Sequence, residues 1–298
     1  MDNTPAGKKS SPRDTIRPTK RRLIQLFCAL LFNAHLRGFA SGKIYNGKLK
    51  AVCVPGLNCY SCPGAVGACP LGALQNAVSS LNRRIPFYVF GIVMLYGMLL
   101  GRTICGWLCP FGLIQELLHK IPSPKIKKSG FTRALSYLKY VILIVFVAAI
   151  PLYYMFFKGM PVPGFCKYIC PAGTLEGAVI MLARGTLKTS MLGALFAWKV
   201  VVLAVILAAC ILCYRVFCRF LCPLGAIYGL FNELSLIGVN IDMKSCDGCG
   251  VCVRDCEMDV RRVGDRECIH CGKCVEKCHA HALAMRTIGK KTAGKTEV

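Results

Sequence analysis

Long apolar stretches alternate with shorter polar segments through the first three quarters of the chain. Four of these stretches are long enough to be membrane spans, because about 20 apolar residues cross the hydrocarbon core of a bilayer. They cover residues 23–40, 86–104, 138–157 and 192–217. The third is the most continuous, whereas His35 and Arg37 interrupt the first. The pattern predicts a mostly α-helical membrane protein with four transmembrane helices.

A cleaved signal peptide is the alternative interpretation of the first apolar stretch. A basic start, a short apolar run and the segment Phe39-Ala40-Ser41 resemble such a peptide. The long polar arm in front of it and the polar residues Asn33, His35 and Arg37 inside it favour a retained span instead.

Composition and charge agree with a membrane location. The chain has 298 residues, of which 55% are hydrophobic and 17% charged, and its net charge is +24. A nucleic-acid-binding domain is basic but need not be this apolar, so we expect a membrane protein with basic flanks and no nucleic-acid partner. Basic residues are concentrated in the N-terminal arm, in the loop between the second and third spans, and in the C-terminal segment. This distribution predicts a multi-pass protein of the cell (inner) membrane with both termini in the cytoplasm. Residues 1–19 and 287–298 are predicted to be a disordered arm and tail.

One short motif occurs four times, once after each predicted span. Its form is Cys-Pro-x-Gly-x-(Leu/Ile), and the copies begin at Cys69, Cys109, Cys170 and Cys222. Three copies carry a further cysteine four residues upstream, and these are Cys105, Cys166 and Cys218. The first copy instead follows Cys59-x-x-Cys62. Residues 20–235 are therefore predicted to be a four-helix domain of two pseudo-repeats, with a cysteine turn at each face.

The motif has a physical reason for each of its parts. Proline at the first helical position loses no helical hydrogen bond, so the cysteine before it lies at the helix cap. The positive end of the helix stabilises an anionic, thiolate-ligated group there. The alternatives are helical turns with idle cysteines and, on the outer face, a disulfide. Four matching copies favour metal ligation.

The C-terminal segment, residues 236–286, contains two tight runs of cysteines with the spacing Cys-x-x-Cys-x-x-Cys-x-x-x-Cys. This is the double run of a two-cluster bacterial ferredoxin, in which the fourth cysteine of each run ligates the other cluster. The first [4Fe–4S] cluster is predicted to use Cys246, Cys249, Cys252 and Cys278. The second is predicted to use Cys268, Cys271, Cys274 and Cys256. Zinc is the alternative, but it is typically bound by two separated cysteine pairs. We expect an α+β two-cluster domain, in which Glu257 and His279 replace the usual proline after each fourth cysteine.

Residues 20–286 resemble the NapH/MauN type of membrane ferredoxin, with more distant similarity to NosR- and CcoG-like polyferredoxins. The similarity lies in the segments 58–64, 68–75, 105–110 and 218–223 and in the ferredoxin tail. The resemblance implies four membrane helices, cytoplasmic termini and the role of a quinol dehydrogenase membrane component, which moves quinol electrons to partners across the membrane. The family also includes assembly and maturation factors, so the resemblance alone leaves two classes of function.

The remaining cysteines predict two further clusters, one at each membrane face. Two CxxxC pairs on the cytoplasmic side, Cys105 with Cys109 and Cys218 with Cys222, provide the four thiolates that one cubane needs. On the outer side, Cys69 and Cys170 are the firmest candidates. Cys166 follows by analogy with Cys105 and Cys218, and the fourth ligand is Cys59 or Cys62. A disulfide or a thiol site for a partner's metal is the alternative there. The two faces are separated by about 30 Å of hydrocarbon, so something must bridge them or they serve separate tasks.

The remaining polar residues and cysteines are predicted to have surface, interface or packing roles. Glu116 and His119 are expected to be solvated on a basic amphipathic helix, and His35 to lie at the interface rather than bind a quinone. Lysine and arginine near the cytoplasmic face are expected to meet anionic lipid. Cys28, Cys210 and Cys213 are expected to pack as small apolar residues between helices.

Two functions remain. The first is an electron-transfer protein between a quinol pool or cytoplasmic donor and an extracytoplasmic redox partner, possessing no catalytic residue of its own. The second is a factor that reduces or matures a metalloenzyme. The chain has no P-loop, dinucleotide fingerprint or nucleophile elbow that would favour another chemistry. A redox sensor lacks any recognisable output domain.

Overall fold

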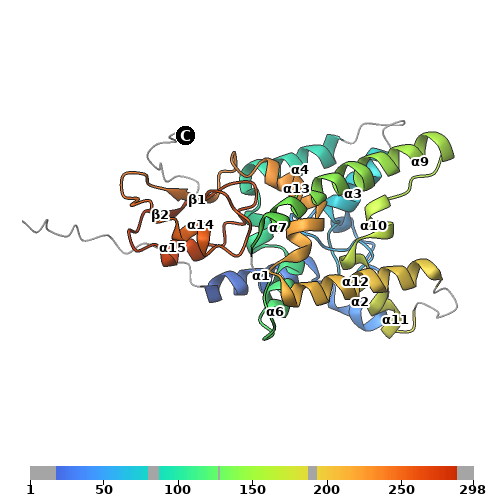
Figure 1. The fold of residues 1–298 in the computed structure, drawn as a ribbon. Helices are drawn as coiled ribbons and strands as arrows, with labels where there is room; N and C mark the ends of the chain where they lie inside the picture. Colours follow the sequence, from blue (N-terminus) through green and yellow to red (C-terminus); the bar gives the residue numbers. More distant parts are fainter. Residues whose placement is uncertain (1–17, 80–86, 127, 187–192, 287–298) are drawn as a thin grey trace, which may run out of the picture.

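The computed structural model describes residues 18–79, 87–126, 128–186 and 193–286 (Figure 1). Most of the predicted disordered arm, the whole of the predicted tail at 287–298, and the first residues of the second and fourth predicted spans lie outside the described residues. Two helical segments are long and apolar enough to cross a membrane, and these are Gly130–Lys158 and Ala194–Leu212. They correspond to the third and fourth predicted spans. The count of four spans stays a prediction.

The first half of the chain forms helices separated by one long loop. Its elements are α1 (Pro18–Phe32), α2 (Leu36–Ser41), the 3-10 helix η1 (Lys48–Ala51), α3 (Pro70–Ser79), α4 (Phe87–Leu100), α5 (Thr103–Trp107) and α6 (Pro110–His119). The first predicted span is not one helix, because α1 ends at Phe32 and α2 begins at Leu36. His35 lies in this break, where its backbone N–H donates to the carbonyl of Gly64 and its Nδ1 lies 3.1 Å from the carbonyl oxygen of Pro63.

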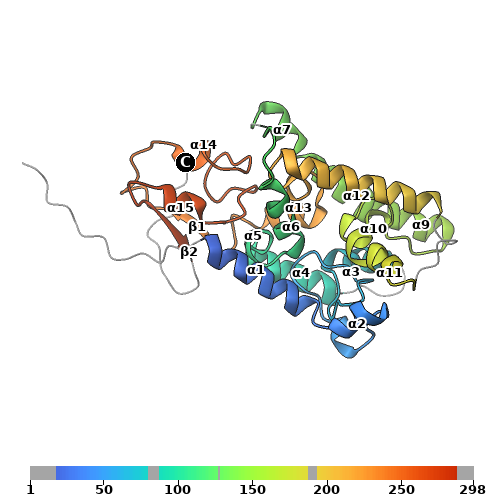
Figure 2. The same cartoon turned by 90° about the horizontal axis from the view of Figure 1, so that it is seen from below.

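The second half repeats the alternation of long helix and short turn. Its elements are α7 (Gly130–Leu135), α8 (Leu138–Ile142), the π-helix η2 (Leu143–Ala149), α9 (Ile150–Lys158), α10 (Gly164–Tyr168), the π-helix η3 (Gly173–Val179), α11 (Ile180–Ala183), α12 (Ala194–Leu212), the π-helix η5 (Phe217–Leu221) and α13 (Pro223–Leu230). Figures 1 and 2 show α4, α9 and α12 running along the same length of the molecule.

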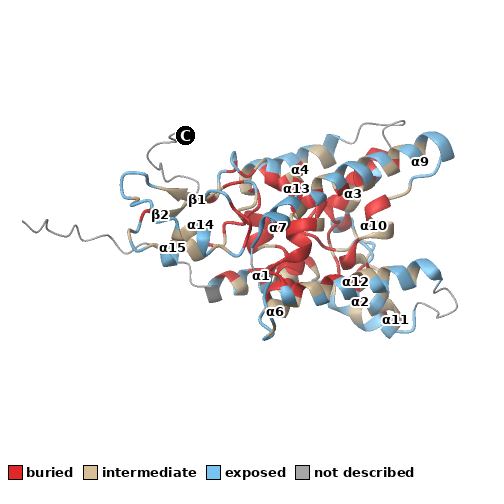
Figure 3. Cartoon of the chain, viewed as in Figure 1, coloured by how far each residue is buried: buried red, intermediate tan, exposed pale blue. Residues whose placement is uncertain are grey.

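Buried residues gather where the short helices meet between the long ones (Figure 3). The core there contains large apolar side chains, such as Phe111, Phe165 and Phe217, together with many of the cysteines. The loop of residues 52–69 runs into this core. Its backbone polar groups are paired, for example Val54 N–H with the carbonyl of Ala68, which permits irregular backbone at depth.

The C-terminal segment forms a separate module at one end of the helices (Figures 1 and 2). Strand β1 (Gly238–Ile241) pairs antiparallel with β2 (Leu283–Arg286), with Gly238 opposite Arg286. Two short helices, α14 (Val251–Arg254) and α15 (Lys273–Lys277), lie between the strands in sequence. Each begins after a glycine with positive φ, 66° at Gly250 and 81° at Gly272, a conformation that disfavours other residues.

The module contacts the helical domain at the turn that contains Cys105. Trp107 Nε1 donates to the carbonyl of His270 at 2.9 Å. Gly106 approaches the module so closely that a Cβ at this position would lie 2.2 Å from the carbonyl oxygen of Ile269. Arg102 and Lys139 both form ion pairs with Glu267 of the module. The module is thus attached by backbone contact and by buried charge.

Candidate functional site

The structure brings Cys105, Cys109, Cys218 and Cys222 to one cavity, which we call the inner site. All four are buried. Cys109 is the N-cap of α6 and Cys222 is the N-cap of α13, each followed by proline at the first helical position. The backbone N–H of Gly225 donates to the Cys222 sulfur at 3.4 Å. The motif therefore forms helix starts that present thiols to a common point.

The four thiols of the inner site affect one another electrostatically. Burial, together with the neighbouring Cys218 and Cys105 thiolates, raises the pKa of Cys109 to about 12. Burial likewise raises the pKa of Cys222, with the same neighbours contributing. Four buried thiolates so close together need a cation among them, and a metal centre that displaces the protons satisfies this need.

Two arginines cross between the halves of the inner site. Arg102 lies three residues before Cys105, and Arg215 lies three residues before Cys218. Arg215 Nη1 donates to the carbonyl of Cys105 at 2.5 Å, and Arg102 Nη2 donates to the carbonyl of Cys218 at 3.0 Å. Each arginine therefore supports the cysteine turn of the other half. Both side chains are fully buried.

A second cavity, of about 350 Å³, is lined by Cys59, Cys69, Cys166 and Cys170, and we call it the outer site. Burial raises the pKa of Cys69 to about 11, and Cys170 adds to the increase. Cys62 does not line this cavity, and its thiol instead donates to Asn33 Oδ1 at 3.5 Å. Of the two candidates for the fourth ligand, the structure therefore places Cys59 beside the other three.

Equivalent glutamines support the two sites. Gln75 and Gln115 each lie six residues after the motif cysteine of their repeat. Gln75 Nε2 donates to the Cys166 sulfur and Gln115 Nε2 donates to the Cys218 sulfur, both at 3.1 Å. Their Oε1 atoms accept from the backbone N–H groups of Phe165 and Phe217, at 2.9 Å and 3.0 Å. The sequence analysis missed both glutamines, although their common offset in the first two repeats is a visible signal.

The eight cysteines of the module line two adjoining cavities. One cavity is lined by Cys246, Cys249, Cys252, Cys274 and Cys278. The other, of about 200 Å³, is lined by Cys252, Cys256, Cys268, Cys271 and Cys274. Each predicted ligand set lies at a cavity of its own, and the third cysteine of each run lies at both. Burial raises the pKa of Cys268 to about 12 and that of Cys256 to about 11.

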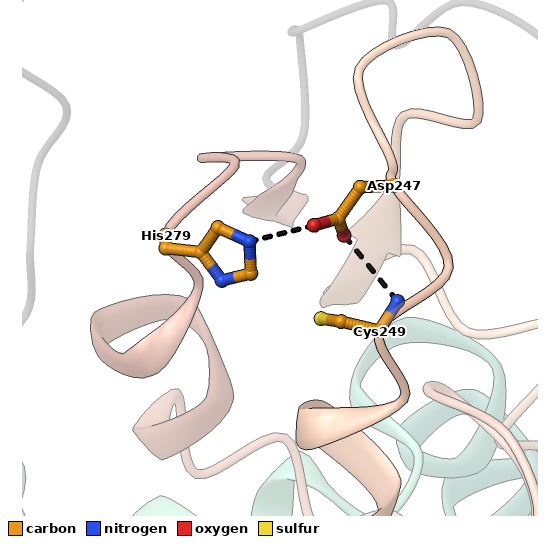
Figure 4. A group of neighbouring side chains, drawn as sticks. All are labelled: Asp247, Cys249 and His279. Carbon is orange, nitrogen blue, oxygen red and sulfur yellow. Dashed lines mark hydrogen bonds and ion pairs between the residues drawn. The ribbon is translucent and has the colours of Figure 1, made fainter.

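Two residues next to ligand cysteines pair at the surface of the module (Figure 4). Asp247 Oδ2 lies 2.6 Å from His279 Nε2, and Asp247 Oδ1 accepts from the backbone N–H of Cys249 at 3.4 Å. Asp247 follows Cys246 and His279 follows Cys278, so the pair joins the two ends of one ligand set. His279 occupies the position where proline is usual in the predicted ferredoxin pattern.

The expectation that Glu116 is solvated is wrong. Glu116 is 5% exposed and is surrounded by donors. Its two oxygens accept from Arg21 at 2.9 and 2.6 Å, from Arg215 Nη2 at 2.7 Å and from the Tyr214 hydroxyl at 2.6 Å. Burial alone raises the pKa of a carboxyl, but Arg215 and Arg21 lower that of Glu116 to about 2. His119 is partly buried, with its ring 5.4 Å from that of Tyr214.

The assignment of basic residues to anionic lipid is also wrong for the buried ones. Arg102, Lys139 and Arg215 form ion pairs inside the protein, and Arg219 pairs with Asp259. The sequence around each of these basic residues did not indicate its partner, because the carboxylates come from distant segments. Cys28, Cys210 and Cys213 are buried, as expected for small residues between helices.

The donor chemistry fits iron–sulfur clusters. Each of the four cavities presents thiols, which are the ligands of [4Fe–4S] centres, and helix starts or glycine turns surround them. The inner and outer sites each provide the four thiols that one cubane requires. Buried arginines beside the inner site offset the negative charge that thiolates and cluster carry together.

Comparison with known proteins agrees with this chemistry. The family described as "4Fe-4S binding domain" matches residues 67–88, 85–129, 139–190 and 194–241, which together make up more than half of the chain. Each match contains one copy of the Cys-Pro motif. No solved structure gives a significant match.

Three relatives each match more than half of this chain. An uncharacterized protein of Methanocaldococcus jannaschii is 27% identical over 67% of this chain and 78% of its own length. The methylamine utilization ferredoxin-type protein MauN of Paracoccus denitrificans is 26% identical over 63% of this chain and 60% of its own length. The regulatory protein NosR of Stutzerimonas stutzeri is 30% identical over 54% of this chain and 21% of its own length. From the four family matches, the chain belongs to the 4Fe-4S binding domain family, and these relatives agree with the predicted resemblance to MauN-type and NosR-like proteins.

Proposed function

We propose that this protein is a multi-pass electron carrier of the cell membrane that holds four [4Fe–4S] clusters. Its proposed role is to pass electrons between a quinol pool or cytoplasmic donor and an extracytoplasmic redox partner. The observation that carries the proposal is the grouping of its cysteines at four cavities, with four thiols of their own at the inner and outer sites. A [4Fe–4S] cluster supplies reversible one-electron transfer.

The residues of the chain would hold and insulate such clusters. The N-cap cysteines Cys109 and Cys222 direct their sulfurs at the inner site from helix starts. Phe111, Phe217 and Tyr228 line the same cavity and exclude water from it. Gln115 donates to one ligand sulfur and so favours its anionic form. The site is therefore prepared for charge transfer without rearrangement.

The path from the module to the helical domain is short. The segment 268–271 contains ligands of one module cluster, and it contacts the Cys105 turn through Ile269 and His270. Electrons that reach the module therefore have a direct protein contact to the inner site. This arrangement supports an electron carrier more than a metallochaperone, which would not need sites arranged in series.

Iron content and EPR spectra of the purified, anaerobic protein test the proposal. The full chain should hold about sixteen irons, four for each of four cubanes. Cys109→Ser should remove about four of them while the EPR signals of the module persist. The matched variant Cys213→Ser changes a buried cysteine outside the proposed ligand sets and should leave the iron content unchanged. An unchanged iron content in Cys109→Ser, or stable binding of zinc alone, would contradict the proposal.

Both termini are proposed to lie in the cytoplasm. A reporter active only in the cytoplasm should be active when fused after Val298 and inactive when fused after residue 80. The reverse pattern would contradict this orientation and would exchange the inner and outer sites.

A further inference from the structure

The inner and outer sites share a wall. Leu57, which is 2% exposed, lines the inner cavity with Gly56 and also lines the outer cavity with Asn58 and Cys59. The two sites are therefore separated by one residue rather than by the thickness of a bilayer. The 52–69 loop carries outer-site residues into the core, which favours a bridge between the sites over separate tasks for the two faces.

Consecutive residues of this loop line different sites. Gly56 and Leu57 line the inner cavity, and Leu57, Asn58 and Cys59 line the outer cavity. The peptide unit between Leu57 and Asn58 thus joins a residue beside both sites to a residue beside the outer site.

Gly56 brings this segment against the inner site. A Cβ at position 56 would lie 3.3 Å from Cys109 Cα, which is tighter than ordinary side-chain contact, and 3.5 Å from Pro110 Cδ, which is ordinary contact. Gly56 does not have positive φ, so its backbone conformation does not explain a need for glycine. Close approach to the Cys109 turn is the feature that a larger residue would change.

The segment is held from both sides by polar groups of other elements. Tyr228 donates its hydroxyl to the carbonyl of Pro55 at 3.0 Å. Asn33 Nδ2 donates to Asn58 Oδ1 at 3.1 Å, and Glu176 Oε2 accepts from the backbone N–H of Cys59 at 2.8 Å. These partners come from α13, from the break after α1 and from η3. Residues 55–59 therefore have a fixed position between the two sites.

We propose that the peptide Leu57–Asn58 is the contact through which the inner and outer clusters exchange electrons. This inference rests on the proposed function, because it requires a cluster at each site. In the step, one electron leaves the reduced inner cluster and the oxidised outer cluster gains it, while no bond forms or breaks and no proton moves. A low-potential donor at the module supplies the electron. The four ligand sets then form one continuous series, from the module to the outer site.

EPR spectroscopy of the dithionite-reduced full chain tests this contact. Two reduced, paramagnetic clusters separated by one residue should broaden each other's signals. The double variant Cys69→Ala/Cys170→Ala removes the outer site, and the remaining inner-site spectrum should become narrower. If the spectrum of the full chain instead equals the sum of independent clusters, the proposed contact is wrong.

Two glycine variants test the role of position 56, one at that position and one at position 91 as its control. Gly56→Val should push the segment away from Cys109, weaken the inner–outer broadening and slow electron arrival at the outer cluster in rapid-freeze EPR at least tenfold. Gly91→Val is the control, because a Cβ at position 91 has no atom within 4 Å. It should change neither readout. Broadening and rate that are unchanged in Gly56→Val would overturn the assignment of this segment.

Iron content separates the two possible failures. With about sixteen irons per chain and independent EPR signals, the contact fails while the four-cluster proposal stands. With about twelve irons or fewer in the wild-type chain, the four-cluster proposal itself fails. Should Gly56→Val not accumulate, the comparison of the full chain with the Cys69→Ala/Cys170→Ala variant still decides the question.

Discussion

The helical domain and the C-terminal module use the same ligand type in opposite ways. In the inner site, the exposed fraction of each cysteine is 4–6%, and the supporting groups come from segments more than 100 residues away. In the module, Cys249 is exposed and the other seven cysteines are intermediate, within two short runs of sequence. The inner site is therefore built from contacts between distant segments, whereas the module is built from short local turns.

This difference bears on what each region contributes. Cluster potentials depend on solvent exposure and on hydrogen bonds to sulfur. The module has more accessible sulfurs, so in the proposed function it is suited to accept electrons from a soluble electron donor. The potentials of the inner and outer sites would instead depend on hydrogen-bond donors fixed inside the protein. A change in a core support should therefore have a large effect, and an equivalent change in the module a small one.

The largest effect is expected for Glu116→Gln. The substitution removes the charge that Arg21 and Arg215 share, and it leaves buried guanidinium groups uncompensated. Breaking a buried ion pair from one side typically costs about 3–5 kcal/mol. Thermal unfolding in detergent should show a large loss of stability, with loss of the inner-site irons. A wild-type melting curve would contradict the role of this network.

A pH-dependent effect is expected from Glu176, beside the outer site. Burial raises its pKa to about 7, from an ordinary value of 4.5. As pH rises from about 4.5 to 7, the unfolded chain loses its proton while the folded chain retains it, so the folded state becomes less stable by about 3 kcal/mol. Above pH 7 the penalty is constant. Glu176→Gln should abolish this dependence in melting curves recorded between pH 5 and pH 8, and an unchanged slope would show that Glu176 is not its source.

An intermediate effect is expected for Gln115→Leu. The backbone N–H of Phe217 loses its acceptor, which costs about 1–3 kcal/mol for a buried group. The Cys218 sulfur loses a donor that favours the more negative, reduced cluster, so the potential of the inner site should fall in an EPR redox titration. Gln75→Leu is the matched variant and should lower only the outer potential. If both variants move the same signal, the assignment of the glutamines to separate sites is wrong.

The smallest effect is expected in the module, for Glu257→Gln. Its ion pair with Lys273 is exposed, with 39% and 37% of the two side chains accessible. Exposed pairs contribute less than about 1 kcal/mol. The variant should melt within that margin of the wild type and retain all its iron. A loss comparable to that of Glu116→Gln would remove the contrast between the two regions.

Local repetition made the ligand groups predictable. The Cys-Pro motif marked Cys109 and Cys222 as equivalent, and the structure brings them to one cavity. The two module runs were readable for the same reason, because all eight cysteines lie within 33 residues of sequence. Short-range spacing therefore predicted which cysteines lie together, whereas their role as cluster ligands stays a prediction.

The supports and the depth of the sites could not be predicted in the same way. Glu116 is an isolated acid in a basic stretch, and its partners Arg21 and Arg215 lie about a hundred residues away in either direction. Leu57 has no chemical signature at all, and it matters only because a loop enters the core. The offsets of Arg102 and Arg215 before their cysteines were visible, but the exchange between halves depends on how the helices pack.

The exchange of supports between halves has a consequence for biosynthesis. The outer site combines cysteines from the first and third repeats, and the inner site combines those from the second and fourth. A nascent chain acquires the last outer cysteine at Cys170, the last inner cysteine only at Cys222, and the last module cysteine at Cys278. Arg215 also donates to the carbonyl of Cys105. A nascent chain that ends before residue 215 therefore contains Cys105 and Cys109 without this supporting hydrogen bond. If the inner site holds the proposed cluster, its loading would have to follow synthesis of almost the entire helical domain, and a chain truncated before Arg215 should fail to hold the inner-site irons.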